Sequence, residues 1–360
     1  MGEWLQPPGY SGTTESWNQT WEYSYFPFEE GAADNVIFMA RLFIGVTLAC
    51  VMLVCGVGNV LFILTLAIHK KLRSVTNILI ANLAVSDLLV AIICCPFEMD
   101  YYVIRRQSWA FGRMLCSSVS YLRMMSLYVS TNALLAIAID RYLVIIHPLK
   151  PRMNPQAAYG ILLLIWLSST FIAVPVAYFA TETVFDTPLQ PARKVFCGQI
   201  WTADKAIFYK SYALFLLIAQ FVLPIVFMSL CYVQICHELW FKNLPGVQTE
   251  QLRGRLKARR KTVLVLVAVL FSYIVCWTPF YSYTIVRDFF PSVLLREKHA
   301  IALYYIVECI AISNSMINTL FFITAKNQPD HCLRRLKSSA SIDRNTTFQE
   351  CKTSNHPTAV

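Results

Sequence analysis

Charged side chains are scarce in this sequence. Asp, Glu, Lys and Arg make up 14% of its 360 residues, against about 25% in soluble domains, while hydrophobic residues make up 56%. That balance does not fit a soluble globular protein. The net charge of +10 does not indicate nucleic-acid binding either, because the basic residues fall mostly in short segments between apolar runs.

Lysine and arginine are lacking from residues 1–40, which hold several acidic residues. Because no charged segment precedes an apolar one, this stretch does not resemble a cleaved signal peptide, and we expect the first apolar run to be its own membrane anchor. Paired CxxC clusters that would bind zinc are also lacking. Most of the twelve cysteines lie within apolar runs, as small hydrophobic residues do.

Three further features are lacking, and each argues against a class of membrane protein. No internal repeat relates the two halves of the chain, which argues against a transporter built from inverted repeats. No row of charged or Gly-rich filter residues indicates a pore. No nucleophile paired with a general base stands out, so we do not expect an enzyme.

Long apolar runs are abundant. A membrane-spanning helix needs roughly 20 predominantly apolar residues, and seven segments are long enough: 38–68, 77–104, 114–146, 157–180, 208–239, 262–286 and 300–324. The predicted fold class is an all-α membrane protein with a seven-helix transmembrane bundle over residues 38–325. An N-terminal segment (1–37) precedes the bundle and a tail (326–360) follows it.

Basic residues predict the orientation. More than half of the 31 Lys and Arg lie in three alternate connecting segments and the tail. By the positive-inside rule these parts are cytoplasmic, so we expect an extracellular N-terminus in the plasma membrane. Asn18, in the sequon Asn-Gln-Thr, is then a candidate glycosylation site. Cys116 and Cys197 are the two clearly extracellular cysteines, and we expect a disulfide between them, with two unpaired thiols as the alternative.

Ionisable residues within membrane helices are costly and usually mark function. On the second predicted helix, Asp87 and Glu98 are eleven residues apart, which places both carboxylates on one face at two depths. On the third, Arg123 and Arg141 are eighteen residues apart, which is five whole turns. Each helix therefore carries one charged face toward the bundle interior.

The charged residues of the outer half are expected to border one water-accessible cavity, suited to a ligand that carries an amine and polar backbone groups. They are Glu98, Arg123, Arg287, Asp288 and Glu308. The alternative is that Glu98 and Arg123 only neutralise each other. The two interpretations are compatible, because a ligand amine could compete for Glu98 and release Arg123.

Six short motifs resemble class A (rhodopsin-like) G-protein-coupled receptors: GVGNV with Asn59, NLAVSDLL with Asp87, DRY at 140–142, Trp166, Pro224 and CWTP at 276–279. From about residue 40 to 326, longer stretches such as CCPFEMDYYV, FCGQIW, IVRDFFP and VECIAISNSMINT are similar to prokineticin receptors. One departure concerns the superfamily motif NPxxY, for which this chain has NTLFF. Thr319 replaces the kinking proline, and Phe322 has no hydroxyl for a water bridge to Tyr232.

The resemblance implies roles for residues in the bundle interior. Asp87 matches the superfamily's sodium-binding aspartate, with Ser130, Asn314 and Asn318 as its polar companions; a water cluster around Asp87 is the alternative. Sodium, a hard cation suited to oxygen ligands, would favour the inactive packing. No other cofactor is expected.

The resemblance also implies an activation switch. Asp140 is expected to hold Arg141 until the sixth helix swings outward and the arginine meets the G protein; an ordinary snorkelling arginine is the alternative. Trp277 and Pro279 lie where that helix can bend, and Phe271 is expected beneath Trp277. The segment RGRLKARRK is expected to extend the sixth helix into the cytoplasm.

The tail after Lys326 contains HCLRRLK, which reads as a short amphipathic cytoplasmic helix lying on the membrane lipid. Cys332 within it is a candidate palmitoylation site, with an unmodified thiol as the alternative. The remainder, rich in Ser, Thr and Asn, is expected to be disordered.

Prokineticins are small, disulfide-rich secreted proteins whose family signature is a free N-terminus beginning AVITGA. The resemblance implies that Glu98 accepts this α-amino group, in a pocket whose low dielectric strengthens the pairing. It also implies coupling to a heterotrimeric G protein, of the Gq class with calcium mobilisation, and arrestin as a further partner. The alternatives are a receptor for another peptide or small molecule, a transporter or channel, and a non-signalling decoy.

Overall fold

The computed structural model describes residues 34–69, 73–149, 153–185, 194–200, 206–241, 250–295 and 300–326. Helices form most of this part of the chain. With η denoting a stretch of π-helix, its elements are α1 (Asp34–Ile68), α2 (Val75–Leu89), η2 (Val90–Cys94), α3 (Cys95–Met99), η3 (Asp100–Ile104), α4 (Gly112–Ile146), α5 (Pro155–Phe179), β1 (Ala180–Phe185), β2 (Lys194–Gln199), α6 (Ala206–Leu217), η5 (Ile218–Val222), α7 (Leu223–Phe241), α8 (Glu250–Phe289), α9 (Pro291–Leu295) and α10 (Ala300–Lys326).

Seven of the helical stretches are long and apolar enough to cross a membrane, which confirms the predicted bundle. The largest difference is in the sixth, where α8 begins at Glu250, twelve residues before the predicted apolar run. The basic segment RGRLKARRK therefore belongs to α8, as predicted. Local signals place other helix starts, since Ser74 and Asn154 accept hydrogen bonds from the first turns of α2 and α5.

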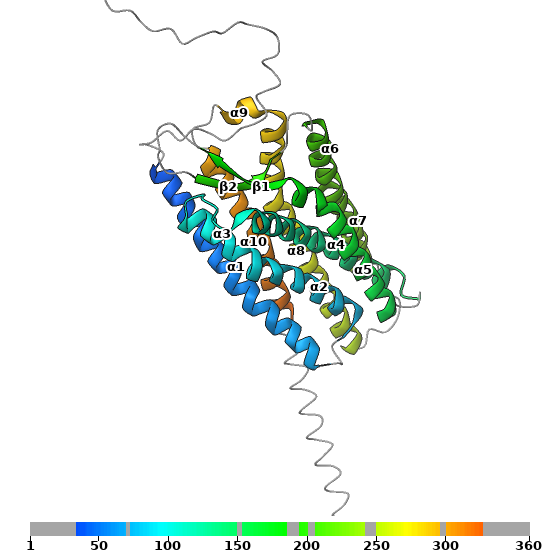
Figure 1. Cartoon of the computed structure of the whole chain (residues 1–360). Helices are drawn as coiled ribbons and strands as arrows, with labels where there is room; N and C mark the ends of the chain where they lie inside the picture. Colours follow the sequence, from blue (N-terminus) through cyan, green and yellow to red (C-terminus); the bar gives the residue numbers. More distant parts are fainter. Residues whose placement is uncertain are drawn as a thin grey trace, which may run out of the picture.

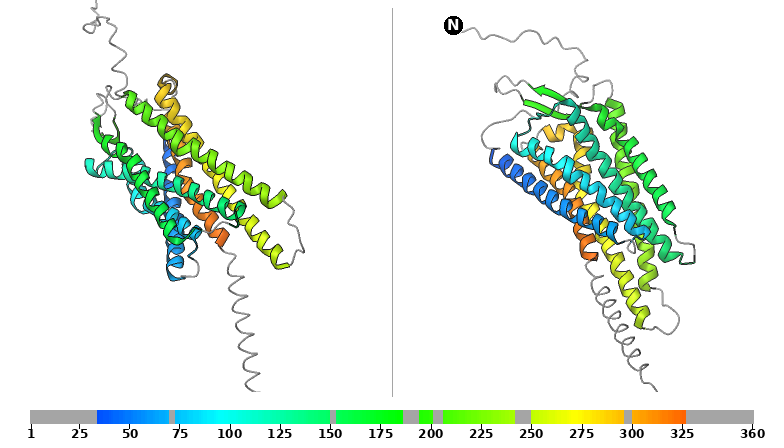
Figure 2. Two further views of the ribbon diagram at one scale, coloured as in Figure 1. Left: turned by 90° about the vertical axis from the view of Figure 1, so that its right-hand side faces the viewer. Right: turned by 60° about the horizontal axis from the view of Figure 1, so that its bottom comes forward.

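Figure 1 shows the helices packed side by side between two ends of the bundle. We call the end that holds β1, β2 and α9 the hairpin end, and the opposite end the Arg141 end. The central helix is α4, which packs against α2, α5 and α7. The two views of Figure 2 also show α1 running beside α10, although these helices are the first and last of the bundle.

A two-stranded β-hairpin, which was not predicted, accompanies the helices at the hairpin end. Strand β1 pairs antiparallel with β2, so that Glu182 lies opposite Cys197. The backbone N–H of Trp109 donates to the carbonyl of Val195 at 2.6 Å, which fastens β2 to the segment before α4. The strands carry several β-branched residues, which favour extended backbone.

The interior of the bundle is divided between two main apolar cores. One lies toward the Arg141 end and includes Ile137, Met228 and Tyr273. The other lies toward the hairpin end and includes Ile44, Tyr305 and the disulfide half Cys116. Large apolar side chains also cover the outside of the helices, as expected where lipid rather than water is the solvent.

Candidate functional site

Arg123 lies between two carboxylates toward the hairpin end. Its Nε is 3.4 Å from Glu98 Oε1, and its Nη1 donates a hydrogen bond to Glu308 Oε1. The three side chains come from α4, α3 and α10, so the group, which we call the acid cluster, joins three elements far apart in the sequence. All three residues were predicted from the sequence, but the hydrogen bond between Arg123 and Glu308 was not.

The acid cluster has more negative than positive charge. Glu98 and Glu308 are 7% and 2% exposed, and one guanidinium faces two carboxylates, which leaves a formal charge of −1. Glu98 Oε2 and Glu308 Oε2 are buried and make no hydrogen bond within the described residues. Buried carboxylate oxygens without partners are costly. The cluster is therefore suited to accept another cationic donor, and neutralisation of Glu98 by Arg123 does not account for it.

Tyrosine rings surround the acid cluster. Tyr102 and Tyr304 are close enough to Arg123 to interact with it electrostatically. Tyr305 lies edge-on to Tyr102 at 5.3 Å and its ring is 6.3 Å from that of Tyr304. Tyr304 in turn lies 5.6 Å from Tyr283 of α8. These contacts form a continuous aromatic chain from η3 across α10 to α8.

Arg287 and Asp288 form a second ion pair rather than part of the acid cluster. Arg287 Nε donates to Asp288 Oδ1 at 2.7 Å, and Arg287 Nη2 donates to the hydroxyl of Tyr209 at 2.8 Å. Tyr283 lies one helical turn before Arg287 on α8. The five predicted residues therefore divide into a cluster of three and a pair, which the aromatic chain connects.

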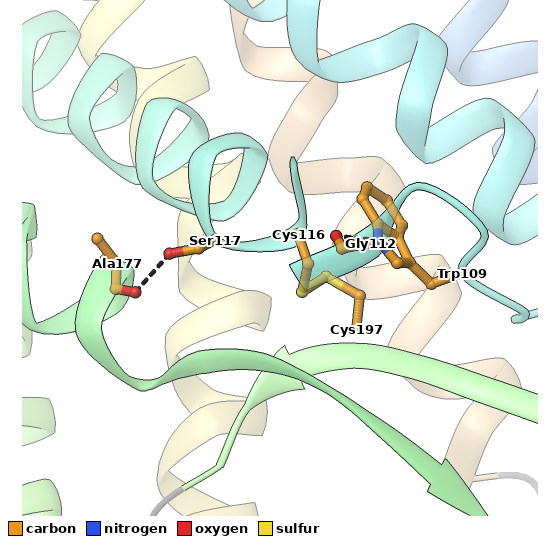
Figure 3. Close-up of a disulfide and its surroundings, with 6 residues drawn as sticks. All are labelled: Trp109, Gly112, Cys116, Ser117, Ala177 and Cys197. Atoms are coloured by element: carbon orange, nitrogen blue, oxygen red, sulfur yellow. Dashed lines mark hydrogen bonds between the residues drawn. A yellow bond between two sulfur atoms is a disulfide. The ribbon is translucent and has the colours of Figure 1, made fainter. Parts of the chain in front are cut away.

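The predicted disulfide between Cys116 and Cys197 is confirmed. Figure 3 shows it joining the first turn of α4 to β2, beside the hydrogen bond from Trp109 Nε1 to the carbonyl of Gly112 at 2.9 Å. Gly112 has φ +79°, which favours glycine at this turn. The same figure shows Ser117 bonded to the carbonyl of Ala177. These contacts fix the hairpin over the end of α4, about two turns from Arg123.

Asp87 is buried in the middle of the bundle, 2% exposed. The hydroxyl of Ser130 donates to Asp87 Oδ1 at 3.5 Å, and Ser315, which the sequence analysis missed, also lies within hydrogen-bonding reach. Asn314 Oδ1 and both amide atoms of Asn318 are buried and have no partner in the described part of the chain. A buried carboxylate with two hydroxyl groups in reach offers oxygen ligands of the kind that a hard cation such as sodium prefers.

Asp140 and Arg141 form the predicted pair at the Arg141 end. Arg141 Nη2 donates to Asp140 Oδ2 at 2.6 Å. Thr76 of α2 was not predicted, yet its hydroxyl donates to the same oxygen at 2.9 Å and accepts a hydrogen bond from Arg141. Asp140 is 3% exposed, so the arginine is held by a buried carboxylate rather than only snorkelling. Tyr232 is buried close enough to Arg141 to interact electrostatically.

Trp277 lies in an aromatic group on α8 and is 9% exposed. Its ring centroid is 6.4 Å from that of Tyr273, four residues earlier. The Tyr273 hydroxyl donates to the backbone carbonyl of Gln220 at 2.7 Å and lies 3.3 Å from Thr131 Oγ1. Pro224 has no N–H to bond the carbonyl four residues before it. The proline therefore leaves the Gln220 carbonyl free for Tyr273.

Comparison with known proteins identifies the family. Residues 58–321 match the model of the 7 transmembrane receptor (rhodopsin family). The chain is 57% identical over 324 residues to prokineticin receptor 2 of Homo sapiens, which covers 87% of this chain and 84% of that protein. It is 54% identical over 357 residues to prokineticin receptor 1 of Homo sapiens, with 95% and 91% covered. The chain belongs to the prokineticin receptor family. It is thus a G-protein-coupled receptor, a multi-pass protein of the plasma membrane.

The structure corrects one predicted switch residue of the receptor. Phe271 is 67% exposed on the outside of the bundle, whereas Tyr273 is 1% exposed and packs against Trp277. Six residues turn a helix by about 600°, which places Phe271 about 120° away from Trp277, but four residues turn it by only about 40° beyond a full turn. The four-residue spacing was the signal that could have identified Tyr273.

Several predicted features of the receptor lie outside the described residues. They are the glycosylation site Asn18, the palmitoylation site Cys332 and the amphipathic helix HCLRRLK. Pro279, by contrast, lies inside α8 as predicted, and Phe322 packs against the apolar core that contains Tyr232.

Proposed function

We propose that this receptor binds a prokineticin-type secreted peptide through the peptide's free N-terminal amine, which enters the acid cluster from the hairpin end. The observation that carries the proposal is the pair of buried oxygens Glu98 Oε2 and Glu308 Oε2, which have no partner among the described residues, in a cluster of net charge −1. The names of the curated relatives support this ligand class.

An α-ammonium group suits the acid cluster for two reasons. It brings one positive charge, which neutralises the excess carboxylate charge, and it brings several N–H donors for the two free oxygens. In a low-dielectric pocket this pairing is stronger than in water. The anchor is then shared between Glu98 and Glu308, with Arg123 holding both carboxylates in place from the other side.

One ion pair does not supply enough energy for full activation. A shift from 1:99 to 99:1 requires about 5.5 kcal/mol of differential binding, so contacts along the peptide must contribute. The aromatic chain from Tyr102 to Tyr283 leads toward Arg287 and Asp288. We propose that this second ion pair contacts backbone or side chains of the same peptide at the rim.

The proposed orientation places the hairpin end outside the cell and the Arg141 end in the cytoplasm, in accordance with the positive-inside rule. Ligand binding favours a state in which α8 moves away and Arg141 exchanges Asp140 and Thr76 for the G protein. We propose a Gq-class protein with calcium mobilisation, and arrestin as a later partner of the same opened end.

A sodium ion is proposed as the modulator of this equilibrium. Asp87 and Ser130 would hold it, with the amide oxygens of Asn314 and Asn318 as further ligands. A bound cation neutralises the buried carboxylate and stabilises the packing around it, so it would favour the resting state.

Calcium release in cells that express the receptor tests the proposal. We expect a response to prokineticin with its native N-terminus and a potency at least tenfold lower, equivalent to about 1.4 kcal/mol, for ligand extended by one residue. Glu98→Gln and Glu308→Gln should each reduce the potency of the native ligand, because they remove a carboxylate charge but keep the shape of the side chain. The difference in potency between the native and the extended ligand should therefore become smaller.

The matched control is Asp100→Asn, since Asp100 pairs at 2.8 Å with the exposed Arg105 and lies outside the acid cluster. Normal potency of both glutamine variants at normal surface expression would contradict the amine site. If wild-type receptor activates another Gα subunit but releases no calcium, only the Gq assignment is wrong.

A further inference from the structure

Helices α1 and α10 approach each other closely at Gly58. A Cβ atom at this position would lie 2.7 Å from Thr319 Cγ2 and 2.8 Å from Ile323 Cδ1, both on α10. These distances are too short for carbon atoms in contact, so a methyl group at residue 58 would force the side chains of Thr319 and Ile323 to move. Glycine at residue 58 therefore allows the close approach of Thr319 and Ile323 to α1.

The same threonine joins the two helices by hydrogen bonds. Thr319 is 2% exposed and Asn59 is 5% exposed. A hydroxyl has one donor and two acceptor sites. Thr319 Oγ1 donates to the carbonyl of Ser315 in its own helix at 2.9 Å and accepts from Asn59 Nδ2 at 3.1 Å. We call the Asn59 and Thr319 pair the α1–α10 clasp.

The packing around the clasp is incomplete. A cavity of about 10 Å³ lies between α1, α2 and α10, and its lining includes Asn59, Asp87, Thr319 and Phe322. Atoms that face a void lose dispersion contacts. Asn318, beside Thr319, is 0% exposed, and its amide atoms make no hydrogen bond to any described residue. Helix α10 therefore borders a cavity at Thr319 and carries a buried amide without a described partner at Asn318.

We propose that the α1–α10 clasp sets the ligand-independent activity of the receptor, with Thr319 as a positioning residue. The clasp exists in an arrangement where Arg141 is bonded to Asp140 and Thr76. Its loss raises the free energy of this arrangement relative to one in which α10 has shifted. Helix α10 runs unbroken from Ala300 to Lys326, because Thr319, unlike proline, keeps its backbone N–H. The hydrogen bond between Asn59 and Thr319 thereby takes the place of a proline kink in setting the position of α10.

The proposal depends on G-protein coupling, which the family shows, and not on the acid cluster or on Gq. The experiment therefore measures nucleotide exchange without ligand, on a panel of Gα subunits, divided by the amount of receptor at the surface. Thr319→Val removes the hydroxyl but keeps the shape, and we expect it to raise basal exchange about fivefold, the effect of losing one hydrogen bond. Thr319→Ser keeps the hydroxyl and should stay near wild type.

Thr324→Val is the matched control, because Thr324 is an exposed residue of α10 whose hydroxyl, among the described residues, bonds only the carbonyls of Leu320 and Phe321 in its own helix. Asn59→Ala should raise basal exchange as Thr319→Val does, and the double variant should add little to either single change. The Asn59→Ala variant also provides the test if Thr319→Val does not reach the surface.

Unchanged basal exchange in Thr319→Val and Asn59→Ala at normal surface expression would overturn the proposal. An equal rise in Thr319→Ser would also overturn it, because the effect would then come from packing and not from the hydroxyl. The peptide response of the acid-cluster variants does not enter these measurements of basal exchange. The proposal on the α1–α10 clasp and the proposal on the peptide site can therefore each fail without the other.

Discussion

Arg123 on α4 donates a hydrogen bond to Glu308 on α10, 185 residues later in the chain, and thereby ties the centre of the bundle to its last helix. The same guanidinium contacts Glu98 at 3.4 Å. One cation therefore stabilises two buried carboxylates, and each of them retains an oxygen for a further donor.

Removal of this cation should destabilise the fold. In Arg123→Gln two buried carboxylates lose their counter-charge, which costs about 3–5 kcal/mol. We expect less receptor at the surface and a lower melting temperature in detergent. The double variant Arg123→Gln with Glu308→Gln should recover part of the loss, because it removes one of the uncompensated charges. A double variant no more stable than Arg123→Gln would contradict the bridging role.

Loss of the disulfide should weaken ligand binding more than it weakens the membrane bundle. Cys116→Ala or Cys197→Ala frees the hairpin from α4 and removes a cross-link, whose typical contribution is about 2–4 kcal/mol. We expect a large loss of peptide affinity in binding assays on intact cells. Cys50→Ala is the control, since Cys50 is a free, exposed cysteine of α1. Equal affinity in all three variants would show that the hairpin does not shape the binding site.

Thr76 should restrain the receptor in the absence of ligand. Its hydroxyl bonds both Asp140 and Arg141, so Thr76→Val removes two contacts that hold the arginine. We expect basal nucleotide exchange to rise about fivefold or more, as one lost hydrogen bond predicts. Thr65→Val is the control, because within the described part of the chain the Thr65 hydroxyl bonds only the Leu61 carbonyl of its own helix. A basal rate at the wild-type level in Thr76→Val would contradict this role.

Tyr273 should matter for stability and Phe271 should not. Tyr273→Phe leaves the buried Gln220 carbonyl without the donor it has at 2.7 Å, which costs about 1–3 kcal/mol. Phe271→Leu exchanges one lipid-facing apolar side chain for another and should change the melting temperature little. The comparison of both variants by thermal unfolding in detergent checks this. A larger loss of stability in Phe271→Leu than in Tyr273→Phe would contradict this assignment and favour Phe271 as the residue beneath Trp277.

Sodium should reduce the affinity of the receptor for its peptide through Asp87. We expect weaker binding in sodium chloride than in choline chloride at the same ionic strength, because the ion favours the resting state. Asp87→Asn should abolish the difference by removing the carboxylate that the ion requires. Sodium sensitivity that persists in Asp87→Asn would place the ion elsewhere.

Much of the membrane topology could be predicted because the bilayer imposes it. A spanning helix must supply roughly 20 apolar residues, and all seven predicted runs coincide with spanning helices. The pairing of Cys116 with Cys197 followed from topology alone, since they were the two cysteines assigned to the outside. The Asp140 and Arg141 pair was accessible because its members are neighbours in sequence.

Tertiary structure alone decided which partners the buried polar groups have. In a membrane helix, apolar residues face both lipid and interior, so hydrophobicity did not distinguish lipid-facing Phe271 from buried Tyr273, although their spacing from Trp277 could have done so. The π-helical stretch η2 also lies between Asp87 and Glu98, where it alters the regular turn. The sequence determined the helices, the charges and the departure at Thr319. Only packing brought Thr319 to Asn59, 260 residues apart, and Glu308 to Arg123, 185 residues apart. Contacts between residues so distant in sequence depend on how all the helices of the bundle pack together.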